Sequence, residues 1–425
     1  MLLFPFSALA SEEAVMNGAD TAWILTSIAL VLFMTLPGLS LFYGGLARSK
    51  NVLSVLMHCF AIACLISILW LVYGYGMAFG DGGAFNSIIG GGKYFLAGIG
   101  TESLSGSIPE GVFSMFQLTF AIITPALIAG AWVERIRFSA VLLFSGLWFT
   151  LVYLPLCHWV WGGGWMAEQG VMDFAGGIVV HISAGVASLV IALVLGPRRG
   201  FPTSLMPPHN MTMAFSGAAM LWVGWFGFNG GSALAAGGGA GFAIMATHMA
   251  AAAGSLGWMT IEWIRHGKPS VLGIITGMVA GLGTVTPASG FISPLGGAVI
   301  GLIAGITCYW AVIIIKQKLK IDDSLDVFPV HGVGGILGTL LTAIFASPAM
   351  GGLGYASEGM NMVSQLGVQF LGVAGAVIWT AMMTWIILRA IGMVSELRVS
   401  ENDETEGLDV TCHNERGYIM ENSQY

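Results

Sequence analysis

Two histidines, His181 and His331, lie in stretches that are otherwise apolar enough for a lipid bilayer. His181 belongs to "DFAGGIVVHISAG" and follows Asp173, and His331 belongs to "DVFPVHGVGG" and comes five residues after Asp326. An imidazole can accept or donate a hydrogen bond, relay a proton or bind haem iron. An ionisable residue inside a membrane span indicates a functional site by default. The plainer alternatives are a hydrogen bond between helices for each histidine and a helix cap for each aspartate.

The composition of the whole chain predicts the kind of fold in which these histidines lie. Of 425 residues, 56% are hydrophobic and only 9% are charged, against about 25% charged in a soluble domain. About 20 apolar residues span a bilayer as a helix. The chain has eleven such runs, at 21–43, 52–79, 111–132, 138–160, 178–195, 210–230, 240–264, 270–286, 294–315, 327–346 and 363–391. We therefore expect an all-α polytopic membrane protein with eleven transmembrane helices.

The eleven runs fall into two similar halves. "LFYGGLA" at 41–47 ends the first run and resembles "FGFNGGSA" at 226–233, which ends the sixth. An Asp followed by a His opens both the fifth run and the tenth. An offset of five spans inverts the second half relative to the first, as in many transporters. We expect a first five-helix repeat over 20–195, an inverted repeat over 210–346 and a final helix over 363–391.

The inverted arrangement limits how the two histidines can meet. Each lies near the start of its helix, and the two helices enter the membrane from opposite faces. The rings meet only if both helices begin near mid-membrane, after the non-helical lead-ins "WGGGWMAEQGVMDFAGG" and "IDDSLDVFP". Irregular backbone is tolerated at this depth when it is buried in protein or lines a cavity. Short, interrupted spans at matching places in two halves indicate a transport site.

Basic residues predict the orientation of the chain. Of the 15 Lys and Arg residues, Lys93 alone lies on the side of the even-numbered loops. Because positively charged loops stay in the cytoplasm, we expect an outside N-terminus and a cytoplasmic tail over 392–425, in a cell (inner) membrane. Residues 1–10 end in an A-x-A pattern but lack a basic n-region. They are either a signal-peptide remnant or an unstructured extension.

Aromatic residues near the predicted outer ends of the helices suit a small cation. Phe116 and Phe120, four residues apart, share one face of the third run. Trp161 follows the fourth run, and Phe228 precedes Ser232 at the end of the sixth. A cage of Trp and Phe with one hydroxyl would bind such a cation, each cation–π contact contributing about 0.5–2 kcal/mol. The alternative is an aromatic belt at the membrane interface.

The remaining histidines, the cysteines and the net charge do not indicate a further functional site. His58 and His248 lack an acidic residue before them and a counterpart in the other half, which favours helix packing. The five cysteines show neither CxxC nor Cys/His ligand spacing, so we expect no disulfide framework and no metal site. The net charge of −7 argues against a nucleic-acid partner. The alternative of a membrane cytochrome, with His181 and His331 as haem ligands, would need a wide pocket for the haem. We set this alternative aside, and we expect no cofactor and no enzyme activity.

Seven stretches give a more specific indication. They are "LFYGGLARSKNVLS", "ERIRFSAV", "WGGGWMAEQGVMDFAGGIVVHISAG", "WFGFNGGSA", "VTPASG", "DVFPVHGVGG" and "EGLDV". In this order they resemble the ammonium transporter (Amt/Mep/Rh) family, on its Amt branch, over nearly all of residues 20–411. The resemblance implies a homotrimer with one pore per subunit and ammonium or methylammonium as substrate. It also implies a PII-type signal protein that docks on the tail.

The same resemblance implies roles for residues described above. The family motifs place the outer recruitment site on Trp161, Phe116 and Ser232, the paired phenyl gate on Phe120 and Phe228, the twin pore histidines on His181 and His331, and a buried acid on Asp173. One departure is Pro329, two residues before His331; proline fits a helix start, so we expect little change.

The implied function is capture of ammonium at the outer site, its deprotonation, and passage of ammonia through the pore. An isolated charge in a low-dielectric pore is costly, so an ammonium ion should lose its proton there. A potassium ion has no proton to lose and must be desolvated in full. The alternative within the family is an ammonium sensor that signals through the tail.

Overall fold

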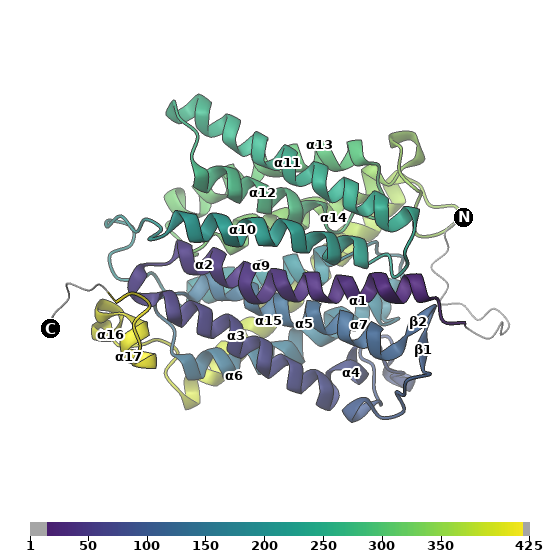
Figure 1. Cartoon of the computed structure of the whole chain (residues 1–425), viewed down its shortest axis with the longest axis horizontal. Coiled ribbons are helices and arrows are strands. Elements are labelled where there is room, and N and C mark those ends of the chain that lie inside the picture. Colours follow the sequence, from purple (N-terminus) through teal and green to yellow (C-terminus); the bar gives the residue numbers. More distant parts are fainter. Residues whose placement is uncertain (1–14, 420–425) are drawn as a thin grey trace.

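The computed structural model describes residues 15–419, and within them the chain is an almost entirely helical bundle (Figure 1). Ten helical segments of this range are long and apolar enough to cross a membrane, and a shorter apolar helix, Val271–Val285, lies between two of them. Together they account for the eleven predicted spans and confirm the polytopic all-α fold. The predicted signal-peptide remnant at 1–10 lies outside the described residues.

The helices follow one another along the chain, and the longest connection between them, residues 80–109, carries the two short strands. They are α1 (Gly18–Phe33), α2 (Ser40–Leu46), α3 (Val52–Leu69), α4 (Tyr75–Phe79), α5 (Glu110–Trp132), α6 (Phe138–Trp148), α7 (Leu154–Trp161), α8 (Trp165–Glu168), α9 (Ser183–Leu195), α10 (Met211–Trp225), α11 (Gly238–His266), α12 (Val271–Val285), α13 (Pro294–Val312), α14 (Val333–Phe345), α15 (Met362–Val394), α16 (Glu401–Glu406) and α17 (Leu408–His413). Two short strands, β1 (Leu104–Ser105) and β2 (Ile108–Pro109), pair antiparallel.

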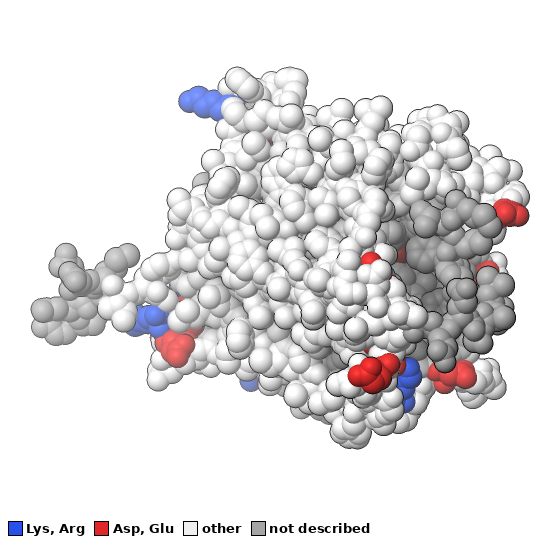
Figure 2. Space-filling model, turned by 45° about the vertical axis from the view of Figure 1, so that its right-hand side comes forward, with Lys and Arg blue, Asp and Glu red and all other residues white. Residues whose placement is uncertain are grey.

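The bundle has two distinct ends. The C-terminal helices α16 and α17 lie at one end, which we call the tail face, and the β1–β2 hairpin lies at the other, which we call the hairpin face (Figure 1). In Figure 2 the flank of the bundle is nearly free of Lys, Arg, Asp and Glu, which gather toward the ends. Large apolar side chains on the surface, such as Phe60, Ile68 and Ile378, are 58%, 59% and 66% exposed. Such an apolar surface suits contact with lipid.

The first and sixth spans begin with the same kind of helix cap, as expected for corresponding helices of a repeat. The Asn17 side chain accepts hydrogen bonds from the Ala19 and Asp20 amides, and the Asn210 side chain accepts one from the Met213 amide. Asparagine is a favoured N-cap because its side-chain oxygen satisfies amides that the first helical turn leaves free. The same cap therefore begins corresponding helices in the two halves.

The fifth and tenth spans each open with a π-helical turn. The turn η7 (Gly177–Ile182) leads into α9, and η10 (Phe328–Gly332) leads into α14. Such turns are rare and often occur at functional sites. The two spans cross closely, since a Cβ at Gly185 would overlap the Gly332 backbone. The absence of a side chain at both positions brings the two helix starts together.

Candidate functional site: a histidine-lined passage

The two histidines meet inside the bundle. The Nδ1 atoms of His181 and His331 are 3.2 Å apart, and their ring centroids are 5.2 Å apart with 15° between the ring planes. Both side chains are buried, at 1% and 4% exposure. A hydrogen bond between two Nδ1 atoms needs one ring to donate and the other to accept, so two neutral rings must be in different tautomers. Their direct contact leaves no room for a haem between them.

Asp173 positions the first histidine by capping its helix. Its Oδ1 accepts from the Gly176 and Gly177 amides, and its Oδ2 accepts from the Ile178 and Val179 amides, at 2.6–3.2 Å. Gly176 has a φ of +115°, which favours glycine. Four amides at a helix start balance the carboxylate charge. The structure thus confirms the predicted cap.

The cap of the tenth span is not the residue that the sequence suggested. Asp323, not Asp326, accepts a hydrogen bond from the Phe328 amide at 2.7 Å. The Asp326 side chain instead pairs with Lys316 at 2.8 Å, so the alternative that Asp326 caps this helix is wrong. Asp323 precedes His331 by the same eight residues that separate Asp173 from His181. That spacing was the signal that could have identified it.

Aromatic rings close the passage on the hairpin side of the histidines. The Phe120 and Phe228 rings lie 4.2 Å apart between centroids, with 32° between their planes. Phe116 and Trp161 meet Phe120 edge to face, at 5.1 and 5.7 Å. The Ser232 hydroxyl donates to the Phe228 carbonyl at 2.8 Å. The structure therefore brings all five predicted aromatic-site residues together.

A narrow cavity connects the Phe228 ring with the two histidines. Its volume is about 10 Å³, room for roughly a single water-sized molecule. Apart from the imidazoles, Trp225 is the only polar side chain that lines it among the described residues. Its ring stacks on His181 at 5.5 Å, and its Nε1–H donates to Thr286. Trp225 is not among the site residues predicted from the sequence. Nothing in its local sequence separates it from the other tryptophans.

A wider cavity of about 340 Å³ continues the passage toward the tail face. His331, Phe42 and Val279 line both cavities. Phe42 is also not among the predicted site residues, although the alignment of "LFYGGLA" with "GFNGGSA" places it opposite Phe228. Within the described residues, no group of three or more His, Cys, Asp or Glu side chains could hold a metal ion.

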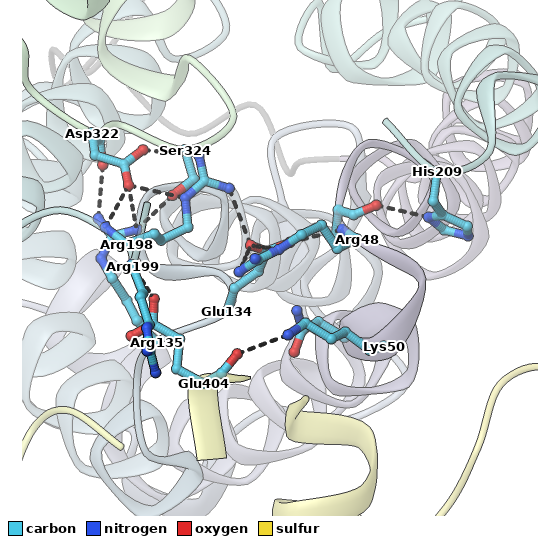
Figure 3. A network of polar contacts seen from close by, with 12 residues as sticks. Arg48, Lys50, Glu134, Arg135, Arg198, Arg199, His209, Asp322, Ser324 and Glu404 are labelled. Carbon is cyan, nitrogen blue, oxygen red and sulfur yellow. Dashed lines mark hydrogen bonds and ion pairs between the residues drawn. The ribbon is translucent and has the colours of Figure 1, made fainter. Parts of the chain in front are cut away.

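Buried ions tie the loops of the tail face together (Figure 3). Glu134 binds Arg48 at 2.6 Å and Arg198 at 3.3 Å, and Arg198 also binds Asp322 at 2.9 Å. Burial alone would raise the pKa of Glu134, but Arg198 and Arg48 hold it below its ordinary value. Burial likewise opposes ionisation of Asp322, yet Arg198 keeps its pKa low. These residues come from four separate loops or segment ends.

The tail packs on this network through Glu404. Its carboxylate accepts from the Arg199 amide and pairs with Arg398 at 2.7 Å, while Lys50 donates to its carbonyl at 3.0 Å. A second contact follows at Asp409, whose Oδ1 accepts from the Ser54 amide at 2.8 Å, at the start of α3. The tail thus supplies a cap to a membrane-spanning helix.

The chain is similar to known proteins over almost its whole length. The model of the Ammonium Transporter Family matches residues 22–418. An ammonium transporter of Bacillus subtilis is 46% identical over 406 residues, covering 95% of this chain and 99% of that one. The ammonium transporter Amt1 of Archaeoglobus fulgidus is 43% identical, covering 95% of this chain and all of its own.

Solved structures agree with these sequence relatives. A structure named "Sensor Amt Protein" superposes with a TM-score of 0.86 at 31% identity, covering 92% of this chain and 97% of that one. Mep2 of Saccharomyces cerevisiae superposes with a TM-score of 0.82 at 36% identity, covering 92% of each chain.

Proposed function

Because the chain belongs to the ammonium transporter family, we propose that it transports ammonium across a membrane by passing ammonia between His181 and His331. The observation that carries this proposal is the hydrogen-bonded pair of rings in an otherwise apolar cavity. Relatives that are 43–46% identical are named transporters, which favours transport over sensing alone.

Capture takes place at the hairpin face. Trp161 and Phe116 offer aromatic rings, and Ser232 adds a hydroxyl oxygen that can accept a hydrogen bond from an ammonium ion. Each cation–π contact adds about 0.5–2 kcal/mol. The Phe120 and Phe228 rings then separate the captured ion from the histidines and must move to let it pass.

Deprotonation follows from the small apolar cavity beyond the phenyl rings. A cavity the size of one water molecule cannot hold the hydration shell of a cation, and burying an unpaired charge is costly. Ammonia fits and finds hydrogen-bond partners in the two imidazoles. Potassium is excluded because it cannot become neutral by losing a proton. The proton itself is either left outside or passed along the imidazole pair, which can relay it.

The distribution of charge supports an orientation in the membrane. The hairpin face points outward and the tail face into the cytoplasm of a cell membrane, since the basic residues gather on the tail side. The chain forms a homotrimer with one pore in each subunit. The tail is regulatory and docks a PII-type signal protein; its contacts with Lys50, Arg199 and Ser54 support a link between the tail and the helices.

Purified protein in proteoliposomes tests the proposal. We expect saturable uptake of methylammonium and no current when potassium replaces it. A sustained current during uptake would mean that charge moves with the substrate, and uptake without current would mean that neutral ammonia moves. Absence of uptake by folded trimers would contradict the proposed function.

A further inference from the structure

The wider cavity contains a lysine whose ammonium group has a defined place. Lys316 lines the cavity at the end of the ninth span, in the turn η9 (Ile313–Lys318). Its Nζ donates to Asp326 Oδ2 at 2.8 Å and to the Ser324 carbonyl at 3.1 Å. Both partners also line the cavity. A carboxylate and a carbonyl therefore hold an ammonium group beside the passage from His331.

Asp326 has fewer fixed partners than Glu262, the other carboxylate that lines this cavity among the described residues. Glu262 accepts from the Trp258 indole at 3.2 Å, and from the Ser270 amide and hydroxyl at 3.0 and 2.8 Å. Among the described residues, Lys316 is the only side chain with a hydrogen bond to Asp326, whose Oδ1 is shut off from solvent and has no partner. Without Lys316, this carboxylate would be uncompensated at the mouth of the passage.

The chemistry of the occupant identifies the ligand that the site would take. A lysine head group is an ammonium ion with one alkyl substituent, and it donates three hydrogen bonds as a compact point charge. The same oxygens would hold NH4+ or methylammonium. We propose that Asp326 and the Ser324 carbonyl form an ammonium site at the tail-face mouth, which Lys316 fills so that cations do not enter the passage from that side.

This inference rests on the proposed function and adds a direction to it. Ammonia that leaves past His331 is neutral and does not need this site. An ammonium ion that approaches from the tail face meets oxygens that already hold the Lys316 ammonium group. At the hairpin face the Asp173 carboxylate is taken up by backbone amides, and among the described residues no lysine or arginine forms a cation–π contact with the aromatic site. We expect the apparent KM from the tail face to exceed that from the hairpin face.

Transport from each face can be measured separately. Vesicles are sorted by the accessibility of a tag placed after residue 425, and methylammonium uptake gives KM for each orientation. The readout is the ratio of the tail-face KM to the hairpin-face KM. Lys316→Met should lower this ratio about tenfold, the scale of one charge-assisted hydrogen bond, and should let potassium compete from the tail face. Lys316→Arg, which keeps the charge, should retain the wild-type ratio.

The double variant Lys316→Met/Asp326→Asn decides whether the carboxylate is the site. We expect it to restore a high ratio of the tail-face KM to the hairpin-face KM, because the Asp326 carboxylate that would bind a cation is removed together with the Lys316 ammonium group. An unchanged ratio in Lys316→Met, with trimers intact, would overturn the inference, and so would a double variant that behaves like Lys316→Met. Failure of wild-type uptake from the hairpin face would instead contradict the proposed function.

Discussion

The two mouths of the passage lie on similar helix frameworks but differ in their electrostatics. At the hairpin face, Trp161 and Ser232 are neutral, and the Asp173 charge is balanced by four backbone amides. At the tail face, Lys316 and Asp326 are a fixed ion pair beside the opening. The inverted repeat thus reproduces the helices and the histidines, while the loops and helix ends give each mouth a different distribution of charge.

The capping aspartates show how far the equivalence extends. Asp173 and Asp323 both lie eight residues before a histidine and both cap the helix that carries it. Asp323, however, has the Asp326 carboxylate nearby, and burial together with this charge raises the pKa of Asp323 to about 6. Equal positions in the repeat therefore do not have equal electrostatics, because the surrounding loops differ.

The largest effect should come from the feature that both halves share. His181→Ala and His331→Ala should each reduce methylammonium uptake to less than about a tenth, because ammonia loses hydrogen bonds that together contribute about 1.5 kcal/mol or more at the narrowest point. His181→Glu should instead admit potassium, since a fixed negative charge can hold an intact cation. Uptake and potassium current are measured on trimers of normal stability. Wild-type uptake and potassium exclusion in all three variants would mean that both histidines serve only in helix packing.

The next-largest effect compares how much stability an ion pair contributes at each face. Glu134→Gln should lower the free energy of unfolding by about 3–5 kcal/mol, because it removes the buried carboxylate that pairs with Arg48 and one of the two buried carboxylates that pair with Arg198. The matched control is Lys93→Met at the hairpin face, which removes a partly exposed pair with Glu110 and should cost at most about 1 kcal/mol. Thermal unfolding measures both. Equal losses would contradict the expectation that the ion network at the tail face contributes more stability than the ion pair at the hairpin face.

The stability difference between wild type and Glu134→Gln has a predicted pH dependence. The folded-state pKa of Glu134 is lowered, so its contribution is present above its unfolded pKa of about 4.3 and is lost as pH falls through the lower folded value. The difference in stability between wild type and Glu134→Gln should therefore be constant from about pH 6 to 8 and shrink below about pH 4. A difference that grew on acidification would contradict the ion-pair account.

A smaller effect is expected at the hairpin mouth. Trp161→Leu should raise the apparent KM for uptake from that side by about 3- to 30-fold, corresponding to one cation–π contact. The maximal rate should change less, because the histidines are intact. Uptake is compared at low and high methylammonium. Unchanged uptake at low concentration would remove the recruitment role of Trp161.

The smallest effect concerns the tail. Asp409→Ala removes the cap that the tail supplies to α3 and should cost about 0.5–2 kcal/mol, with the passage itself unchanged. Deletion of residues 396–425 should alter regulation while methylammonium still passes. Loss of uptake in the point variant, with normal folding, would show that the tail is part of the transport machinery.

The sequence by itself determined the spans, because hydrophobic length is a local property and each apolar run must cross the bilayer as a helix. It also identified the two histidines and the aromatic residues, since ionisable and paired aromatic side chains stand out against an apolar background. The predicted orientation, trimer and PII docking remain predictions.

Only the tertiary structure decided which polar groups meet. Asp326 and Asp323 are both acidic and three residues apart, and the choice between them as cap depends on where Lys316 lies after folding. The same holds for Trp225, which reaches His181 only once helices from different halves have packed. Close approach at Gly185 and Gly332 sets these distances. Contacts between residues 150 positions apart, such as those of the two histidines, are fixed by packing, because local sequence specifies a helix but not its neighbour.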